Sequence, residues 1–211
     1  MYFQTDYVMR MIEMMGDFMR KLWLLIFRLT EQDKYDDAYK LLSTHMRRFT
    51  GMDLVMLTSL SADSIIDILP PQRQIAAAEL LSVQAQMLMQ QEQYEDMQRC
   101  LEKAIALFIS AADADDKRAE PLFAQVRQLE LAAGALPLSM YLDLAAFYEA
   151  AGQYACAEDD LARAADMQTA FRADAQAFYE RLLKLPDEQL ERGGLPRAEV
   201  LEGMNRWATR S

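Results

Sequence analysis

The chain has few of the side chains from which metal sites and disulfide frameworks are built. Its 211 residues include one histidine, His45, and two cysteines, Cys100 and Cys156. A single histidine excludes the zinc motif H-E-x-x-H and the paired Glu-x-x-His motif of carboxylate-bridged metal pairs. The cysteines form no C-x-x-C motif, so we expect two reduced thiols beside the core. We expect no metal and no cofactor, and a structural role for His45.

Glycine and proline are also scarce, at seven and six residues, whereas Ala, Leu, Met, Glu, Gln and Arg dominate. This composition favours helix, and no run of alternating β-branched residues competes with it. No glycine pattern of a phosphate-binding loop, a dinucleotide site or a nucleophile elbow is present. The sequence therefore predicts an all-α protein and contains no catalytic motif.

Long uncharged runs are absent as well. A membrane-spanning helix needs about 20 predominantly apolar residues, and charged residues interrupt the most apolar segment, residues 6–29, which we expect to form one long helix capped by Asp6. The N-terminus has no A-x-A cleavage site, so we expect no signal peptide. The 22 Lys and Arg residues face 33 Asp and Glu, which gives a net charge of −11. We expect a cytoplasmic protein without a nucleic-acid partner, because an acidic surface repels phosphate backbones.

The clearest positive pattern lies between Leu138 and Met167. Apolar residues recur at spacings of three and four on two successive segments: Tyr141, Leu144, Ala145 and Tyr148, then Ala157, Leu161 and Ala164. Gly152 lies in the turn between them and can end the first helix, because glycine adopts the left-handed conformation without steric cost. The pattern predicts an antiparallel helical hairpin whose spacing resembles the tetratricopeptide motif.

Two further hairpins of the same register are expected. Tyr35 and Tyr94 each follow a polar turn, as Tyr154 does, and apolar residues flank all three turns at helical spacing. The tyrosines are 59 and 60 residues apart, whereas tetratricopeptide repeats recur every ~34 residues. The sequence therefore predicts an irregular, tetratricopeptide-like array of antiparallel helical hairpins.

Helix-breaking residues divide the rest of the chain. Pro70-Pro71 follows two short helical segments, so we expect a first domain of residues 1–70 and a second of residues 71–211, unless the array is one continuous domain. Gly193-Gly194 ends a short helix, and Pro196 begins the last one. We expect this last helix to cap the array, because an end repeat needs one apolar and one polar face.

Three stretches of the chain resemble a known family: FQTDYVMRMIE near the N-terminus, FYEAAGQYACAEDDL in the middle and AFYERLLKLPDEQLERGGLPRAEV near the C-terminus. They resemble an uncharacterised bacterial family of tetratricopeptide-like helical proteins, and the resemblance extends over nearly the whole chain. It implies a helical fold of this kind and carries over neither an activity nor a functional residue.

Recognition of a protein is the function class that remains. In a tetratricopeptide hairpin the first helix lines the concave groove, and this analogy gives a candidate interaction surface of Trp23, Leu24, Phe27, Gln86, Met89, Leu142 and Glu149. The six apolar residues from Leu22 to Phe27 cover the whole circumference of a helix, so the chain or a partner must cover them. Methionines such as Met9 and Met19 fit either an adaptable binding surface or a core, and we expect core. We expect a protein partner, or self-association into a homo-oligomer, through the first hairpin.

The alternative is an enzyme that uses helix-borne carboxylates such as Asp143, Glu149 and Glu158. The densest acidic group is Glu158-Asp159-Asp160. Three adjacent helical residues point in directions about 100° apart, so they cannot converge on a substrate by themselves. We expect this group to be a solvated face.

Overall fold

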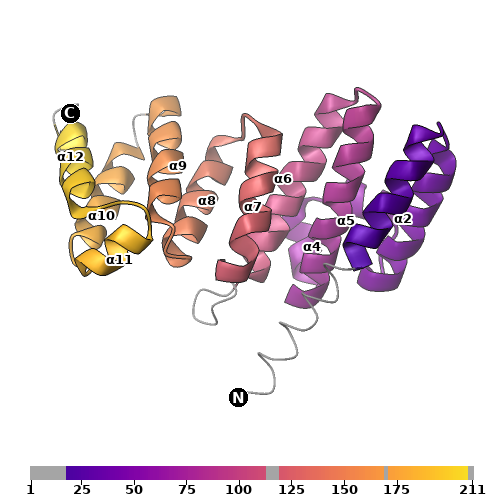
Figure 1. Cartoon of the computed structure of the whole chain (residues 1–211), viewed down its shortest axis with the longest axis horizontal. Coiled ribbons are helices and arrows are strands. Elements are labelled where there is room, and N and C mark those ends of the chain that lie inside the picture. The colour runs from indigo at the N-terminus through magenta and orange to yellow at the C-terminus, as the bar shows by residue number, and fades with distance from the viewer. Residues whose placement is uncertain (1–17, 113–118, 169–170, 209–211) are drawn as a thin grey trace, which may run out of the picture. The chain divides into compact units, whose positions relative to one another are not determined.

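The computed structural model describes residues 18–112, 119–168 and 171–208, and every regular element in these ranges is a helix. In chain order the helices are that of residues 18–31, then α2 (Tyr35–Thr50), α3 (Leu54–Ser59), α4 (Ala62–Ile68), α5 (Pro71–Gln90), α6 (Tyr94–Ala111), α7 (Ala119–Ala133), α8 (Leu138–Ala150), α9 (Tyr154–Met167), α10 (Arg172–Leu182), α11 (Asp187–Arg192) and α12 (Arg197–Ala208) (Figure 1). The all-α prediction is confirmed for these residues. None of the described helices has the length and apolar character needed to cross a membrane. The expected cap Asp6 and the methionines before residue 18 lie outside the described ranges.

The chain divides into two compact units. Unit 1 comprises residues 1–116 and 125–134, and unit 2 comprises residues 117–124 and 135–211. Pro70-Pro71, the expected domain boundary, lies within unit 1. There Pro71 is the first residue of α5, a position at which proline loses no hydrogen bond because the first amides of a helix have no partner in it.

Three turns with the same hydrogen bonds connect pairs of helices. The bonds run from Lys34 N to Leu29 O at 2.9 Å, from Gln93 N to Leu88 O at 2.9 Å and from Gln153 N to Tyr148 O at 2.8 Å. The residue before each donor has a positive φ, 55° at Asp33, 59° at Glu92 and 72° at Gly152, as expected for a Schellman helix end. The residue after each donor is the tyrosine that begins the following helix. Tyr35, Tyr94 and Tyr154 therefore occupy equivalent positions, as the sequence register predicted.

In unit 1, α5 is the central helix. It packs against α2 and, more extensively, against α6, which runs beside it in Figure 1. The helix of residues 18–31 buries Met19, Leu22 and Ile26, whose spacing of three and four places them on one face. Two short helices follow α2, and the side chains of Asp53 and Ser61 cap them by accepting hydrogen bonds from backbone amides.

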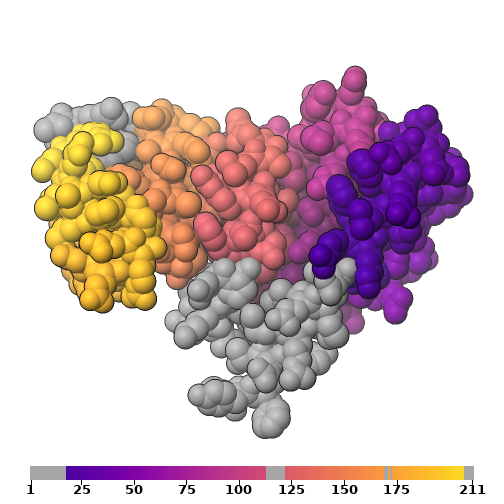
Figure 2. All heavy atoms as spheres, in the orientation of Figure 1, coloured from indigo at the N-terminus to yellow at the C-terminus, as the bar shows by residue number. Residues whose placement is uncertain are grey.

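In unit 2, α8 packs against α9, and α10 packs against both α9 and α12. The C-terminal end of the chain, in yellow, forms a continuous surface in Figure 2. Two glycines permit close packing against α9 and α10. A Cβ at Gly193 would lie 2.2 Å from the ring of Tyr154, and one at Gly203 would lie 2.5 Å from the ring of Tyr179. A larger residue at Gly203 would require the ring of Tyr179 to move, and one at Gly193 would also clash with the backbone oxygen of Gly152 at 2.6 Å.

His45 is part of an aromatic cluster in unit 1. Its ring centroid lies 5.0 Å from that of Phe18 and 6.2 Å from that of Phe49. Its buried Nδ1 atom has no hydrogen-bond partner among the described residues. Burial, followed by the charge of Arg48, lowers the pKa of the imidazole from its ordinary value of 6.5.

The titration of His45 tests this packing. Because the chain has no other histidine, one imidazole NMR signal reports it, and we expect a midpoint below 6.5 in the folded protein. As the pH falls below 6.5, His45 is therefore protonated in the unfolded protein before it is protonated in the folded protein. Folding stability should therefore decrease from that pH down to the folded pKa, and His45→Phe should remove this contribution. A midpoint at or above 6.5 would show that the ring is not desolvated.

Overpacking at Ala157 tests the predicted hairpin face. Ala157 has no exposed surface, whereas Asp159, two residues along α9, is exposed. Ala157→Leu should lower the free energy of unfolding by about 1–3 kcal/mol, because a packed interior has no room for three further carbon atoms. Asp159→Ala should change it by less than about 0.5 kcal/mol. Urea unfolding of both variants measures the difference, and equal effects would mean that the buried face of α9 is misassigned.

Candidate functional site

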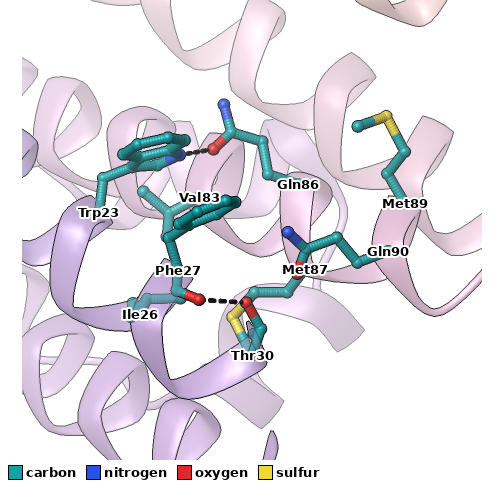
Figure 3. Close-up of a pocket in the computed structure, with 9 residues that line it drawn as sticks. All are labelled: Trp23, Ile26, Phe27, Thr30, Val83, Gln86, Met87, Met89 and Gln90. Atoms are coloured by element: carbon teal, nitrogen blue, oxygen red, sulfur yellow. Dashed lines mark hydrogen bonds between the residues drawn. The ribbon is translucent and has the colours of Figure 1, made fainter. Parts of the chain in front are cut away.

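A pocket of about 230 Å³ lies in unit 1 between the helix of residues 18–31 and α5. Apolar side chains provide most of its wall. The lining residues are Trp23, Ile26, Phe27, Thr30, Val83, Gln86, Met87, Met89 and Gln90 (Figure 3). We refer to this pocket as the unit 1 groove.

Two stacked aromatic rings form one wall of the unit 1 groove. The rings of Trp23 and Phe27 are 5.2 Å apart between centroids and inclined by 11°. They are one helical turn apart, so their side chains lie one above the other on the same face. The indole Nε1 of Trp23 donates a hydrogen bond to Oε1 of Gln86, and the two side chains point toward each other in Figure 3. This contact joins the two helices across the groove.

The sequence placed four of these residues in one candidate surface, and the structure brings those four together: Trp23, Phe27, Gln86 and Met89. Leu24 does not line the groove. The sequence reasoning missed the floor residues Ile26 and Met87, which are buried. Their helical spacing from Trp23 and Val83 was a usable signal, because positions three and four residues apart share a face.

An exposed stripe runs beside the groove on the helix of residues 18–31. Lys21, Leu24, Leu25 and Arg28 are all exposed and recur at helical spacing. Leu24 and Leu25 are 46% and 52% exposed, so the chain covers only part of the apolar run from Leu22 to Phe27. Lys21 and Arg28 form no ion pair with any described residue. The stripe is therefore apolar in the middle and basic at both ends.

Leu142 and Glu149, the other two candidate surface residues, lie in unit 2. They line a separate pocket of about 280 Å³ that also includes Arg181 of α10. Both oxygens of Glu149 accept hydrogen bonds from Arg181 at 2.7 Å. This bond is the main cause that raises the pKa of Arg181. Periodicity within α8 gave no indication of Arg181, because the spacing within one helix does not identify its partner on another.

The acidic group Glu158-Asp159-Asp160, considered above as part of a possible enzyme site, has two members that contact other side chains of unit 2. Glu158 accepts a hydrogen bond of 2.5 Å from the hydroxyl of Tyr179. Asp160 has no exposed surface, and its Oδ1 lies 2.7 Å from Nη1 of Arg163. The expectation of a solvated acidic face is therefore wrong at Asp160. The cause is local: Arg163 lies three residues along the same helix, where it can reach the buried carboxylate.

Metal-binding clusters of His, Cys, Asp and Glu are absent from the part of the chain that the structure describes. Within the same residues, neither Cys100 nor Cys156 forms a disulfide. Burial raises the pKa of the Cys100 thiol to about 11, so this thiol is protonated at neutral pH. A protonated, buried thiol is a poor nucleophile.

Comparison with known proteins gives a family and no relative of established activity. No curated protein and no solved structure matches the chain. The model of one family matches residues 2–211, nearly the whole length. The chain belongs to this family of unknown function, DUF6483.

Proposed function

We propose that the protein is a cytoplasmic, non-catalytic, tetratricopeptide-like helical scaffold whose unit 1 groove binds an amphipathic helix of a protein partner. The observation that carries the proposal is an apolar, aromatic-walled groove beside a stripe whose basic ends form no ion pair with a described residue. Helix α12 acts as the cap of the array in this proposal, with Val200 buried and Glu199 and Glu202 exposed.

The repeated turns support a repeat protein. Three turns share one hydrogen-bond pattern and one backbone conformation, and a tyrosine follows each of them. Stacked helix pairs of this kind present extended surfaces formed by the first helix of each pair. The unit 1 groove lies between two such first helices, residues 18–31 and α5.

The groove has the chemistry of a helix-binding site. Peptide helices bind such grooves by inserting apolar residues spaced by three, four and seven. Trp23 and Phe27 provide adjacent aromatic contacts, and aromatic residues contribute most to binding at such centres. Met89 adds a flexible and 53% exposed side chain, which can adapt to more than one apolar shape.

The charge of the first hairpin favours an acidic partner. Residues 18–50 carry seven Lys or Arg and four Asp or Glu, although the whole chain is strongly acidic. Lys21 and Arg28 at the ends of the stripe have no carboxylate partner among the described residues. A symmetric contact between two copies would bring like charges together, which is unfavourable. An amphipathic helix with Asp or Glu beside its apolar face would pair with both basic ends.

Two synthetic helices test the proposal. They share one Leu, Met and Phe face and differ only in flanking Glu or Lys residues. Trp23 fluorescence in a Trp207→Phe background reports binding, because the chain has only two tryptophans. We expect the Glu-flanked helix to bind at least tenfold more tightly, with an affinity that falls as salt rises.

Charge reversal provides the matched control. Lys21→Glu with Arg28→Glu should invert the preference and leave thermal stability nearly unchanged, since both side chains are exposed and unpaired. Arg73→Glu, at an exposed arginine of unit 1 that does not line the groove, should have little effect. Failure of both helices to bind would reject the groove as a helix site. A dimer in light scattering that Trp23→Ala dissociates would indicate a second copy as the occupant instead.

A further inference from the structure

A second pocket of unit 1, of about 270 Å³, has polar walls from three helices. Its lining residues are Thr58 of α3, Gln84 and Leu88 of α5, and Asp96, Arg99, Cys100 and Lys103 of α6. The residues of α6 are three, four and seven positions apart, so they lie on one face of that helix. We refer to this pocket as the polar pocket.

Gln84 is the unusual member of the polar pocket. It is only 6% exposed, and its buried Oε1 atom has no hydrogen-bond partner among the described residues. A buried amide oxygen without a partner is destabilising, and most such atoms in proteins are paired. The Oε1 of Gln74, on the same helix, also has no partner among the described residues, but its Nε2 donates to the carbonyls of Ile66 and Leu69, and Gln74 does not line the pocket. Gln84 therefore lacks a donor that a molecule in the pocket could supply.

Lys103 provides a fixed positive charge in the same pocket. Its Nζ donates to the carbonyl of Leu57 at 3.0 Å and to that of Thr58 at 2.7 Å. These carbonyls belong to the last turn of α3, which has no amides of its own to pair with them. An ammonium group has three donors, so one remains for a ligand. Burial is the main cause that lowers the pKa of Lys103, and a nearby anion would offset that cost.

Charges of both signs line the polar pocket. Arg99 lies 3.4 Å from both Glu95 and Asp96. Glu95 is exposed and does not line the pocket, so Asp96, Arg99 and Lys103 give the lining a net charge of +1. A site with separated charges of both signs suits a ligand that also carries both signs. The pocket, at about 270 Å³, is smaller than the ~300–1,000 Å³ of typical drug-sized sites, which favours a small ligand.

From these observations we propose that the polar pocket binds a small zwitterion of the α-amino-acid class. The ligand carboxylate accepts from Lys103, and the ligand ammonium group donates to Oε1 of Gln84 and to the carboxylate of Asp96. Leu88 and Cys100 provide the apolar contact for the aliphatic part of the ligand. The site is separate from the unit 1 groove, and either can exist without the other.

Binding to the full-length chain tests the site. The probes are free glycine, alanine, leucine, serine and glutamate, with succinate as an anion that lacks the ammonium group and ethylamine as a cation that lacks the carboxylate. We expect at least one amino acid to raise the melting temperature and to give saturable calorimetric binding, and both single-charge probes to bind at least tenfold more weakly.

Two glutamine variants make the test specific. Gln84→Leu should weaken the binding of that amino acid at least tenfold, about 1.4 kcal/mol, while preserving the unliganded fold, because it removes a buried atom that has no partner. Gln125→Leu removes another amide with an unpaired buried Oε1 in unit 1, but Gln125 does not line the polar pocket, so the affinity should be unchanged. Absence of binding by every amino acid would overturn the proposal and leave a water-filled pocket. Equal binding of succinate, or equal loss in both variants, would also overturn it.

Discussion

The burial of α5 on most of its circumference is the constraint on which unit 1 depends. Helices α2 and α6 pack against α5, and twelve of its twenty residues are buried. Its buried residues lie on most sides of the helix, so its amphipathic pattern is weak and its position depends on its neighbours. The uncovered part near its C-terminal end contains Gln86, Met89 and Gln90. These residues face the unit 1 groove, which is therefore the place where the covering of α5 is incomplete.

The same burial explains the polar pocket. Two polar residues of α5, Gln74 and Gln84, lie inside the protein, where each needs a partner. Gln74 finds two carbonyls at the end of α4 and just beyond it, and its donors are satisfied. Gln84 lies ten residues further along, beside α6, where the described residues supply no partner for its oxygen. Both Oε1 atoms lack a partner among the described residues, but only Gln84 lines a pocket from which a ligand could supply one.

Local features of the fold could be read from the sequence because they depend on neighbouring residues. Helix ends and turns are local, and the register of Tyr35, Tyr94 and Tyr154 follows from three turns of one length. Their burial could not be predicted in the same way. Tyr154 is 3% exposed because Gly193 approaches its ring, whereas Tyr94 is 59% exposed. Gly193 is 39 positions away in the sequence, and no periodicity within α9 indicates that contact.

The candidate site also has features that local spacing predicts and features that depend on contacts between distant segments. Trp23 and Phe27 share a face by helical spacing, so their association was predictable. The placement of Gln86 beside Trp23 depended on the hairpin analogy, since these two residues are 63 positions apart in the sequence. Asp160 and Arg181 show the limit of that reasoning. A carboxylate in a charged cluster seemed to belong in water, but Asp160 is buried and lies against Arg163, and Glu149 is held by an arginine from another helix.

Buried and exposed charges have different requirements in this protein. In unit 2, Glu149, Glu158 and Asp160 contact groups of their own unit. These carboxylates are partly or fully buried, where removal from water is costly unless a donor compensates. In unit 1, Lys21 and Arg28 are exposed and cost nothing to leave unpaired in water, so their position beside two exposed leucines needs no internal explanation. Protein interfaces have an apolar core surrounded by a polar, solvent-accessible rim, and the exposed leucines and charges of this stripe have that arrangement. The first hairpin, rather than unit 2, is therefore the part of the chain in which a recognition surface should be sought.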